Sequence, residues 1–437
     1  MAASLLLPAV AAGAARRRPA GVALGERVRW GRRAVETLDR LRATYGDGPL
    51  LLRFGGRAVA LPLTPDDVRT VLDRTPTIFS PTTWNEPDPF PPPGAPTAGE
   101  SQRAKARRLD ATASGAARSP LHHLAPVVVA TVRAEAAALL RQTARTGELT
   151  WDDFDAAWWR TVRRLVLGDA ARDDTALAGP LGRPRPAGDW SVLRPRQRHI
   201  RDDFLRRLRQ HAADAGPDTL AGALATRSAG GSADGGPDGS ADAVVRLRPW
   251  WFAYDAAATT VPRTLALLAT HPAHEARARA EIARGGGEPG ALSFTRACAL
   301  ETARLWPSTP SLLRESTEET RWRGRPIAAR TTFVVHTPYF QRFRAGARQE
   351  YADRYTPEIW LDGRAARNPA LVPFGGGTDA HAGTDLVPLT VTTWLAALLE
   401  GHTFQPPAYA PRPGPDGTLP VEFPTHTPHF TARPTGV

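Results

Sequence analysis

The chain has 437 residues, of which 42% are hydrophobic, so it is long and apolar enough to form a large folded core. Its 56 basic and 44 acidic residues give a net charge of +12, but the arginines are dispersed and no basic run is interleaved with aromatic residues. This pattern argues against nucleic-acid binding and favours a solvated basic surface or a docking face for an acidic electron-transfer partner. The single cysteine, Cys298, excludes an internal disulfide framework and a cysteine-rich metal site, and favours a reducing compartment.

The N-terminal stretch "MAASLLLPAVAAGAARRRPAG" is too short in its apolar part to cross a bilayer. Its arginines follow the apolar residues, whereas a secretory signal carries its positive charges first. Later segments are interrupted by charges before they reach the length of a membrane span. We therefore expect a soluble, cytoplasmic protein.

The first hundred residues are predicted to mix helices with short strands. Helical spacing indicates a helix over Glu36–Tyr45, and two short apolar runs predict strands at Leu50–Phe54 and Arg57–Leu61. In "TPDDVRTVL" a helix should open after Thr64, because threonine is a good N-cap and proline and acids favour the first turn. Asn85–Pro96 is rich in proline and should be a loop.

Residues 100–228 are predicted to be mostly helical. Apolar residues recur at helical spacing in "APVVVATVRAEAAALLRQTA", in "FDAAWWRTVRRLVLG", which should end at Gly168, and in "RQRHIRDDFLRRLRQHAADAG". Residues 228–243 are rich in glycine, serine and aspartate, which predicts a flexible internal linker. A long helix is expected next, from about Ala243 to Ala269.

The last third is predicted to contain helices at His274–Ala283 and Phe294–Leu305, followed by short strands within residues 320–338. A buried helix should lie in the apolar run "TDLVPLTVTTWLAALLEGHTF", and the last 30 residues should form a strand pair. The chain is thus predicted to be mainly α-helical with small β-sheets.

Two features of this last third indicate a functional site. Glu301 and Arg304 are three residues apart on a predicted helix and therefore share a face, and Arg354 follows in an aromatic loop from which it could join them. Twenty residues later comes the glycine-rich stretch "FGGGTDAHAG", Phe374 to Gly383, with His381 inside it. Such a stretch brings the backbone close to whatever it holds.

The order of these features resembles the cytochrome P450 superfamily of the bacterial, soluble type, with the heme-ligand cysteine replaced by histidine. The resemblance implies one P450-like domain over residues 1–437, mainly α with small β-sheets. It also implies that Glu301, Arg304 and Arg354 form a buried charge triad that holds the ligand loop. "FAYDAAATTVPRTLALLATHP" matches the oxygen-side helix of the family, and "SQRAKARRL" matches its heme-edge helix.

The resemblance also implies the residues that contact heme. His381 stands at the position of the iron ligand, and Phe374, Gly377 and Gly383 match the frame of the ligand loop. Three arginines stand at or near positions that meet the heme propionates: Arg103, Arg107 and Arg314. On the oxygen side, Asp255 falls on the acid of the family and is the candidate catalytic residue.

Several positions depart from the family pattern. Histidine replaces cysteine at position 381, and Asp379 replaces an arginine that contacts heme. The threonine that follows the family's acid is here Ala256, and Thr259 and Thr260 come about one turn later. Cys298 lies on another helix and is expected to be a small buried core residue rather than a substitute ligand.

Four interpretations of His381 remain open. It could ligate heme iron as a neutral imidazole. Heme could be absent, because Asp379 would bring negative charge near the propionates. Asp379, His381 and Asp385 could instead bind a non-heme metal. Finally, His381 could be an ordinary packed or solvated residue.

The function predicted from these residues is a heme oxidoreductase of monooxygenase or peroxygenase type, acting on a small apolar or aromatic molecule. Without the electron donation of a thiolate, peroxide is a more natural oxidant than oxygen, although a ferredoxin-type redox partner is also possible. The alternative is a heme-free protein of the same fold that binds a small molecule, assists another protein or catalyses non-redox chemistry. The paired tryptophans at 158–159 and 250–251 are expected to belong to the core.

Overall fold

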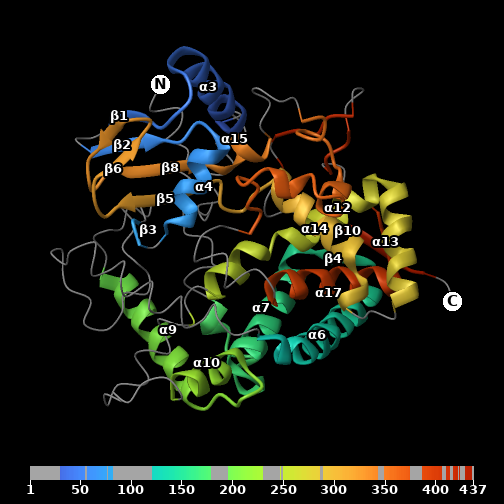
Figure 1. The fold of residues 1–437 in the computed structure, drawn as a ribbon. Coiled ribbons are helices and arrows are strands. Elements are labelled where there is room, and N and C mark those ends of the chain that lie inside the picture. The colour runs from blue at the N-terminus through green and yellow to red at the C-terminus, as the bar shows by residue number, and fades with distance from the viewer. Residues whose placement is uncertain are drawn as a thin grey trace.

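The computed structural model of the chain describes residues 30–54, 57–75, 77–81, 121–178, 195–229, 247, 250–285, 289–342, 349–374, 386–405, 410–413, 417–421, 423 and 429–435. The strands of its largest sheet gather on one side of the molecule beside the N-terminal helices, and the longest helices pack together on another side (Figure 1). The fold is mainly α-helical with small β-sheets, as the sequence predicts.

The helices beside the sheet are α3 (Trp30–Tyr45), α4 (Pro65–Asp73) and α15 (Thr337–Gln341). The remaining helices are α6 (Ala125–Thr146), α7 (Trp151–Leu167), α9 (Pro195–Ala213), α10 (Leu220–Ala229), α12 (Thr260–Thr270), α13 (Pro272–Gly285), α14 (Ser293–Leu305) and α17 (Leu386–Gly401). Residues 250–257 are also helical and directly precede α12.

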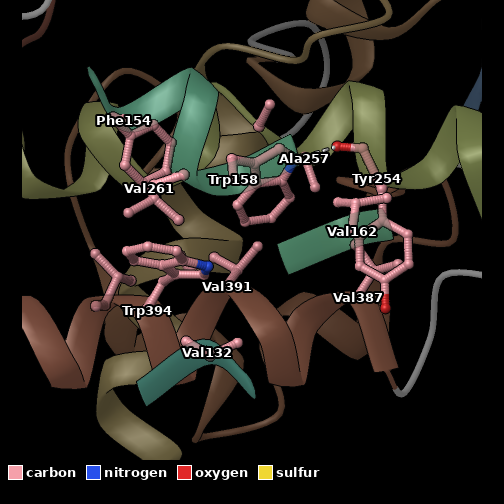
Figure 2. Close-up of a cluster of buried hydrophobic side chains, with 14 of the residues drawn as sticks. Val132, Phe154, Trp158, Val162, Tyr254, Ala257, Val261, Val387, Val391 and Trp394 are labelled. Carbon is pink, nitrogen blue, oxygen red and sulfur yellow. Dashed lines mark hydrogen bonds between the residues drawn. The ribbon is translucent and has the colours of Figure 1, made fainter. Parts of the chain in front are cut away.

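The main core lies where α6, α7, α17 and the helical residues 250–270 meet. Apolar side chains from all four interdigitate there, including Trp158, Tyr254 and Trp394 (Figure 2). Phe154 packs edge-on against Trp394, with ring centroids 5.4 Å apart. The Trp158 indole Nε1 donates to the Tyr254 carbonyl oxygen at 3.2 Å, so this buried polar group is satisfied.

In the described part of the chain, three sheets accompany the helices. The largest has the order β1–β2–β8–β5–β3, and its strands span Leu50–Phe54, Arg57–Leu61, Thr332–His336, Ser311–Ser316 and Phe79–Pro81. Within it β2 and β8 run parallel and the other neighbours run antiparallel. A second, antiparallel sheet joins β4 (Glu148–Thr150), β10 (His429–Pro434) and β9 (His402–Gln405). The third is the hairpin of β6 (Thr320–Trp322) and β7 (Arg325–Ile327).

A second apolar core lies between the large sheet and its helices. Val59 of β2 and Phe333 of β8 are fully buried there, with Leu38 of α3 and Val68 of α4 packed in the same cluster. Because strands alternate their side chains between two faces, and consecutive residues such as Val59 and Ala60 both belong to the cluster, it covers both faces of the central strands. The sheet and the helical body therefore each have a core of their own.

Local sequence signals explain several boundaries. The Thr64 hydroxyl accepts from the Asp67 backbone N–H at 3.2 Å, and the Asp67 carboxylate accepts from the Thr64 N–H at 3.2 Å, which makes a reciprocal capping box. The hairpin between β6 and β7 turns on Arg323 and Gly324, both with positive φ. Such two-residue turns match the twist of the strands, and glycine adopts the conformation without strain.

Most elements predicted from periodicity are confirmed. The strands β1 and β2 have the predicted bounds, and α7 ends before Gly168 as expected. The prediction of one continuous helix over Ala243–Ala269 is wrong, because residues 258–259 form a turn between two helical stretches. Pro262 explains the break, since its ring would clash with the carbonyl four residues earlier in an unbroken helix.

Three other predictions need correction. Helix α10 extends to Ala229 and so includes the start of the predicted linker, whose residues from 230 onward lie outside the description. In the described part of the last 30 residues there is one strand, β10, and its partners β4 and β9 come from earlier in the chain. Strands β3 and β5 were not expected from the sequence.

Among the residues that the structure describes, no helix has both the length and the apolar character needed to span a bilayer.

Trp394 is fully buried at the meeting point of the main core, and its indole Nε1 finds no hydrogen-bond partner among the described residues. We expect Trp394→Ala to lower the free energy of unfolding by about 3–5 kcal/mol, because it leaves a large cavity. Trp394→Phe keeps most of the packing and removes the unpaired N–H, so we expect a loss below about 1.5 kcal/mol. Urea unfolding followed by circular dichroism measures both, and equal losses would contradict the central role of this side chain.

Candidate functional site

The site is organised by a buried ion pair on α14. Glu301 and Arg304 lie one turn apart on the same helix face, and both side chains have no exposed surface. Their contact is bidentate: Arg304 Nε donates to Glu301 Oε2 and Arg304 Nη2 donates to Glu301 Oε1, each at 2.7 Å. A buried pair is stable only when its remaining donors and acceptors are also satisfied.

Residues 351–360 supply most of those remaining partners. Arg304 donates to the carbonyl oxygens of Ala352 and Tyr351 at 2.9 Å. In return, Glu301 accepts from the Thr356 backbone N–H at 2.9 Å and from the Trp360 indole Nε1 at 3.0 Å. The ion pair therefore fixes the path of this irregular segment, which has few backbone hydrogen bonds of regular secondary structure.

The third member of the predicted charge triad differs from the expectation. Arg354 contacts the pair through its carbonyl oxygen, which accepts from Arg304 Nη2 at 3.1 Å, while its side chain is exposed. The side chain that completes the contacts of Glu301 is Trp360. Sequence spacing places Arg354 in the correct loop, but it cannot distinguish a contact made by a guanidinium from one made by a backbone carbonyl.

A second buried pair, missed by the sequence analysis, lies beside the first. Arg342 follows α15, and its Nη1 donates to Asp353 Oδ1 at 3.4 Å. Its Nε donates to the Leu305 carbonyl oxygen at 3.1 Å, at the C-terminal end of α14. Its guanidinium also lies 5.3 Å from the ring centroid of Trp306. The only sequence signal is an arginine directly after an apolar helix, which is too common to be diagnostic.

Arg314 lies on β5, at the centre of a buried strand pairing. Its backbone is opposite Phe333 on β8 and Pro81 on β3, and its side chain is only 4% exposed. One of its Nη groups donates to the Leu313 carbonyl oxygen at 3.0 Å. A buried guanidinium is well suited to bind a carboxylate, because charge-assisted hydrogen bonds are strongest where water is excluded.

Phe374 ends the segment that leads to the glycine-rich stretch. It is half-buried and packs against the main core. The description resumes at Leu386, where α17 begins. The predicted site residues Gly377, His381 and Gly383 lie in the interval 375–385, which the description omits, as do Arg103 and Arg107 farther upstream. The alternative metal ligands Asp379 and Asp385 fall in the same omitted interval.

Asp255 lies in the helical residues 250–257 and is half-buried. The neighbouring Ala257 is buried in the main core, and Thr259 bonds to the Ser308 hydroxyl at 3.0 Å. Thr260 is buried, and its carbonyl oxygen accepts from the Thr264 hydroxyl. Thr259 carries the first side-chain hydroxyl after Asp255, and this hydroxyl is hydrogen-bonded to the segment that follows α14.

The aromatic pairs near Asp255 belong to the core, as expected. Trp158, Trp159, Trp250 and Trp251 are all buried in the main cluster. Cys298 is likewise buried, and burial raises the pKa of its thiol to about 12, so it remains protonated at neutral pH. This agrees with its predicted role as a small core residue.

The charge of Asp255 acts on an ionisable group that the sequence did not indicate. Burial, followed by the charges of Asp255 and Asp152, raises the pKa of Asp155 on α7 to about 7. Asp155 is flanked by aromatic residues in "DDFDAAWW", which is a weak sequence signal for a half-buried acid. Its partner lies 100 positions away, and a distant pairing of that kind cannot be deduced from one sequence.

With this geometry established, the chain can be compared with known proteins. A family model described as cytochrome P450 matches residues 251–430, which include Asp255, the buried pair of α14, the glycine-rich stretch and α17. A solved structure of a zebrafish cytochrome P450 with abiraterone superposes with a TM-score of 0.64 at 16% identity, covering 92% of this chain and 99% of that one. Together these matches support membership of the cytochrome P450 superfamily.

Curated relatives match over shorter segments. A cyclooctat-9-en-7-ol 5-monooxygenase of Streptomyces melanosporofaciens is 30% identical over 151 residues, 32% of each chain. A tryptamine 5-hydroxylase of rice (Oryza sativa subsp. japonica) is 30% identical over 173 residues, 35% of this chain and 32% of its own. The match thus spans about a third of the length of these relatives.

The contribution of Glu301 is testable by substitution. Glu301→Gln leaves Arg304 buried without a counter-ion, and we expect the free energy of unfolding to fall by about 3–5 kcal/mol. The matched control is Glu358→Gln, which breaks the partly exposed ion pair to Arg277 and should cost less than about 1 kcal/mol. Denaturant unfolding measures both, and similar losses would show that burial of the pair does not matter.

A second pair of variants tests which side chain completes the network. Trp360→Phe removes a donor to a buried carboxylate and should cost about 1–3 kcal/mol. Arg354→Ala retains the carbonyl that accepts from Arg304, so we expect a change within about 0.5 kcal/mol. The opposite order of losses, measured in the same way, would restore the arginine triad expected from the sequence.

Proposed function

We propose that the protein is a heme-binding oxidoreductase, of monooxygenase or peroxygenase type, that acts on a small apolar organic molecule. The observation that carries this proposal is the buried Glu301–Arg304 pair with residues 351–360 wrapped around it. In the P450-matching region this arrangement directly precedes Phe374 and the glycine-rich stretch. It holds the chain that leads into the candidate ligand loop.

The described residues suit a heme. Arg314 offers a buried guanidinium for a propionate, and Phe374 offers an apolar ring next to the core. Arg103 and Arg107 would add positive charge at the propionates, Gly377 and Gly383 would shape the loop, and His381 would be the axial ligand. Bound heme would supply the redox-active iron, which with an imidazole ligand lacks the electron donation of a thiolate.

The other residues would bind and orient the substrate and move protons. Asp255 is half-buried on the helix that matches the oxygen side of the family, and the residue after it, Ala256, carries no hydroxyl. A carboxyl group in this position can accept a proton from solvent and release it inward. Thr259 is engaged with Ser308 and is therefore less suited to pass on that proton.

The substrate class is inferred from the names of relatives, and the oxidant from the expected axial ligand. The names of two relatives give cyclooctat-9-en-7-ol and tryptamine as small organic substrates, and this supports a molecule of similar size for the present chain. Imidazole ligation favours peroxide as the oxidant over oxygen activation. A ferredoxin-type partner remains the alternative source of electrons.

The competing proposal is a heme-free protein of the same fold. The replacement of the family's cysteine by His381 and of its arginine by Asp379 supports this second proposal. Such a protein would bind a small molecule, assist another protein or catalyse non-redox chemistry. The two proposals differ in whether the purified protein takes up heme.

Heme reconstitution decides between them. We expect the wild-type protein to bind heme and its ferrous–CO complex to show the absorption band of imidazole ligation. His381→Ala should lose the heme, and His381→Cys should shift the band to the thiolate type. His429→Ala is the control, because this histidine is 53% exposed on β10 and should leave the spectrum unchanged.

Two results would count against the first proposal. If the wild-type protein takes up no heme, the heme-free alternative is favoured. If heme binds but His381→Ala keeps the same spectrum, then another residue is the ligand.

A further inference from the structure

Two histidines and a tyrosine join helix α13 to the segment that wraps around the buried ion pair. His271 is the C-cap of α12, and His274 lies in the first turn of α13. The ring centroid of Tyr355 lies 5.0 Å from that of His271 and 5.3 Å from that of His274, and the two imidazoles are 5.8 Å apart. Tyr355 is buried, and the next residue, Thr356, donates its backbone N–H to Glu301. The histidines therefore contact this segment directly beside its bond to the ion pair.

The surroundings of His271 favour its neutral form. Its Nδ1 lies 2.8 Å from the carbonyl oxygen of Leu267, which can only accept, so Nδ1 carries the hydrogen of the neutral ring. Burial lowers the pKa of His271 below its ordinary value of 6.5, the bond to Leu267 offsets part of this effect, and the charge of His274 lowers the pKa further. A proton added to His271 would thus place a charge in a partly desolvated site beside a second imidazole.

The carboxylate of Glu358 faces His274, but an arginine already occupies it. His274 Nε2 lies 3.8 Å from Glu358 Oε1, and Arg277 Nη1 donates to the same oxygen atom at 3.0 Å. The Arg277 guanidinium also lies over the ring of Phe294, 3.9 Å from its centroid, and the His274 ring is parallel to that ring at 6.0 Å. A protonated His274 would therefore compete with Arg277 for one oxygen atom.

The other charged groups around these rings are either paired or positive. Three acids on α13 and α14 already have partners: Glu275 with Arg279, Glu281 with the backbone N–H groups of Phe294 and Thr295, and Glu301 with Arg304. Exposed arginines lie on α14 and on the adjoining segments: Arg296, Arg354 and Arg412. In the described part of the chain, protons taken up by both imidazoles would thus add positive charge beside Arg277 that these acids do not balance.

We propose that His271, His274 and Glu358 form a proton-operated latch, here called the histidine latch, between α13 and residues 351–360. With both imidazoles neutral, their rings pack on Tyr355 and the latch is closed. When both take up protons, two like charges 5.8 Å apart repel each other, and the contact with Tyr355 loosens. The latch needs no heme. Its further effect, in which pH acts through residues 351–360 on the candidate ligand loop, rests on the proposed function.

The latch predicts how stability depends on pH. The folded chain favours the neutral form of His271, so this contribution is fully present above the ordinary pKa of 6.5 and is lost as the pH falls below it toward the lowered pKa. The urea midpoint of the wild type should therefore fall, relative to that of His271→Asn, between about pH 7 and 5. Parallel profiles for the two proteins would contradict the latch.

Hydrogen–deuterium exchange of the full-length chain tests where the loosening occurs. In the wild type we expect the amide protection of residues 353–360, corrected for the intrinsic exchange rate, to fall severalfold between about pH 7.5 and 5.5, across the ordinary titration of histidine. The double variant His271→Asn, His274→Gln has polar side chains that do not titrate, so its protection should stay constant. His429→Gln is the control, because this exposed histidine pairs with Glu148 on the second sheet and should leave the wild-type response unchanged.

Glu358→Gln gives a result that a merely structural contact would not produce. It retains both imidazoles but removes the carboxylate that partly balances their charge, so the fall in protection should be larger than in the wild type. A wild type whose protection does not change with pH, or an equal fall in the double variant, would overturn the latch. A smaller fall in Glu358→Gln would also overturn it, and this comparison decides the matter even if the double variant does not fold.

Discussion

The buried ion pair between Glu301 and Arg304 is the constraint on which the candidate site depends. Taking two charges out of water is costly, and the attraction between them offsets this cost only if every other donor and acceptor finds a partner. The chain meets that condition by bringing the carbonyls of residues 351–354 to Arg304 and the donors of Thr356 and Trp360 to Glu301. Residues 351–360, which form turns and the short 3-10 helix Pro357–Trp360, thereby gain a defined path.

The same region ties the two apolar cores together. Arg304 also donates to the carbonyl oxygen of Gln341, and Arg342 donates to that of Leu305. These bonds connect the C-terminal end of α14, which packs against α17 and α12, with the end of α15, which packs beside α3 and the sheet. A change in the ion pair would consequently affect both the path of residues 351–360 and the contact between sheet and helices.

The sequence predicted those parts of the fold that depend on local patterns. Helices α6 and α7 have clear helical spacing, and the Thr64 cap determines where α4 begins. Features that depend on distant partners were missed: β10 pairs with strands formed around residues 148 and 403, and β5 is a short buried strand without alternation of polar and apolar residues. The break at residues 258–259 needed only the recognition that Pro262 interrupts a helix.

In the site, the sequence identified the buried pair and its loop but not the atoms that make the contacts. The limit is physical, because a backbone carbonyl satisfies an arginine as well as a carboxylate does, and any residue type can supply it. Arg354 and Trp360 illustrate this: the arginine contributes its carbonyl and the tryptophan contributes its side chain. The residues that the resemblance places around heme remain predictions. Most of them lie in the omitted interval 375–385 or near residue 105.

The buried acids of this fold differ in whether arginines compensate their charge. Burial works against the charge of Glu135, yet bonds from Arg172 and Arg160 hold the pKa of this carboxyl below its ordinary value. Asp353 and Glu301 are likewise matched by arginines. Asp155 is the contrasting case, because burial and the charges of two other carboxylates raise its pKa. A fold with so many arginines could easily have neutralised this position, and perturbed acids of this kind concentrate at functional sites.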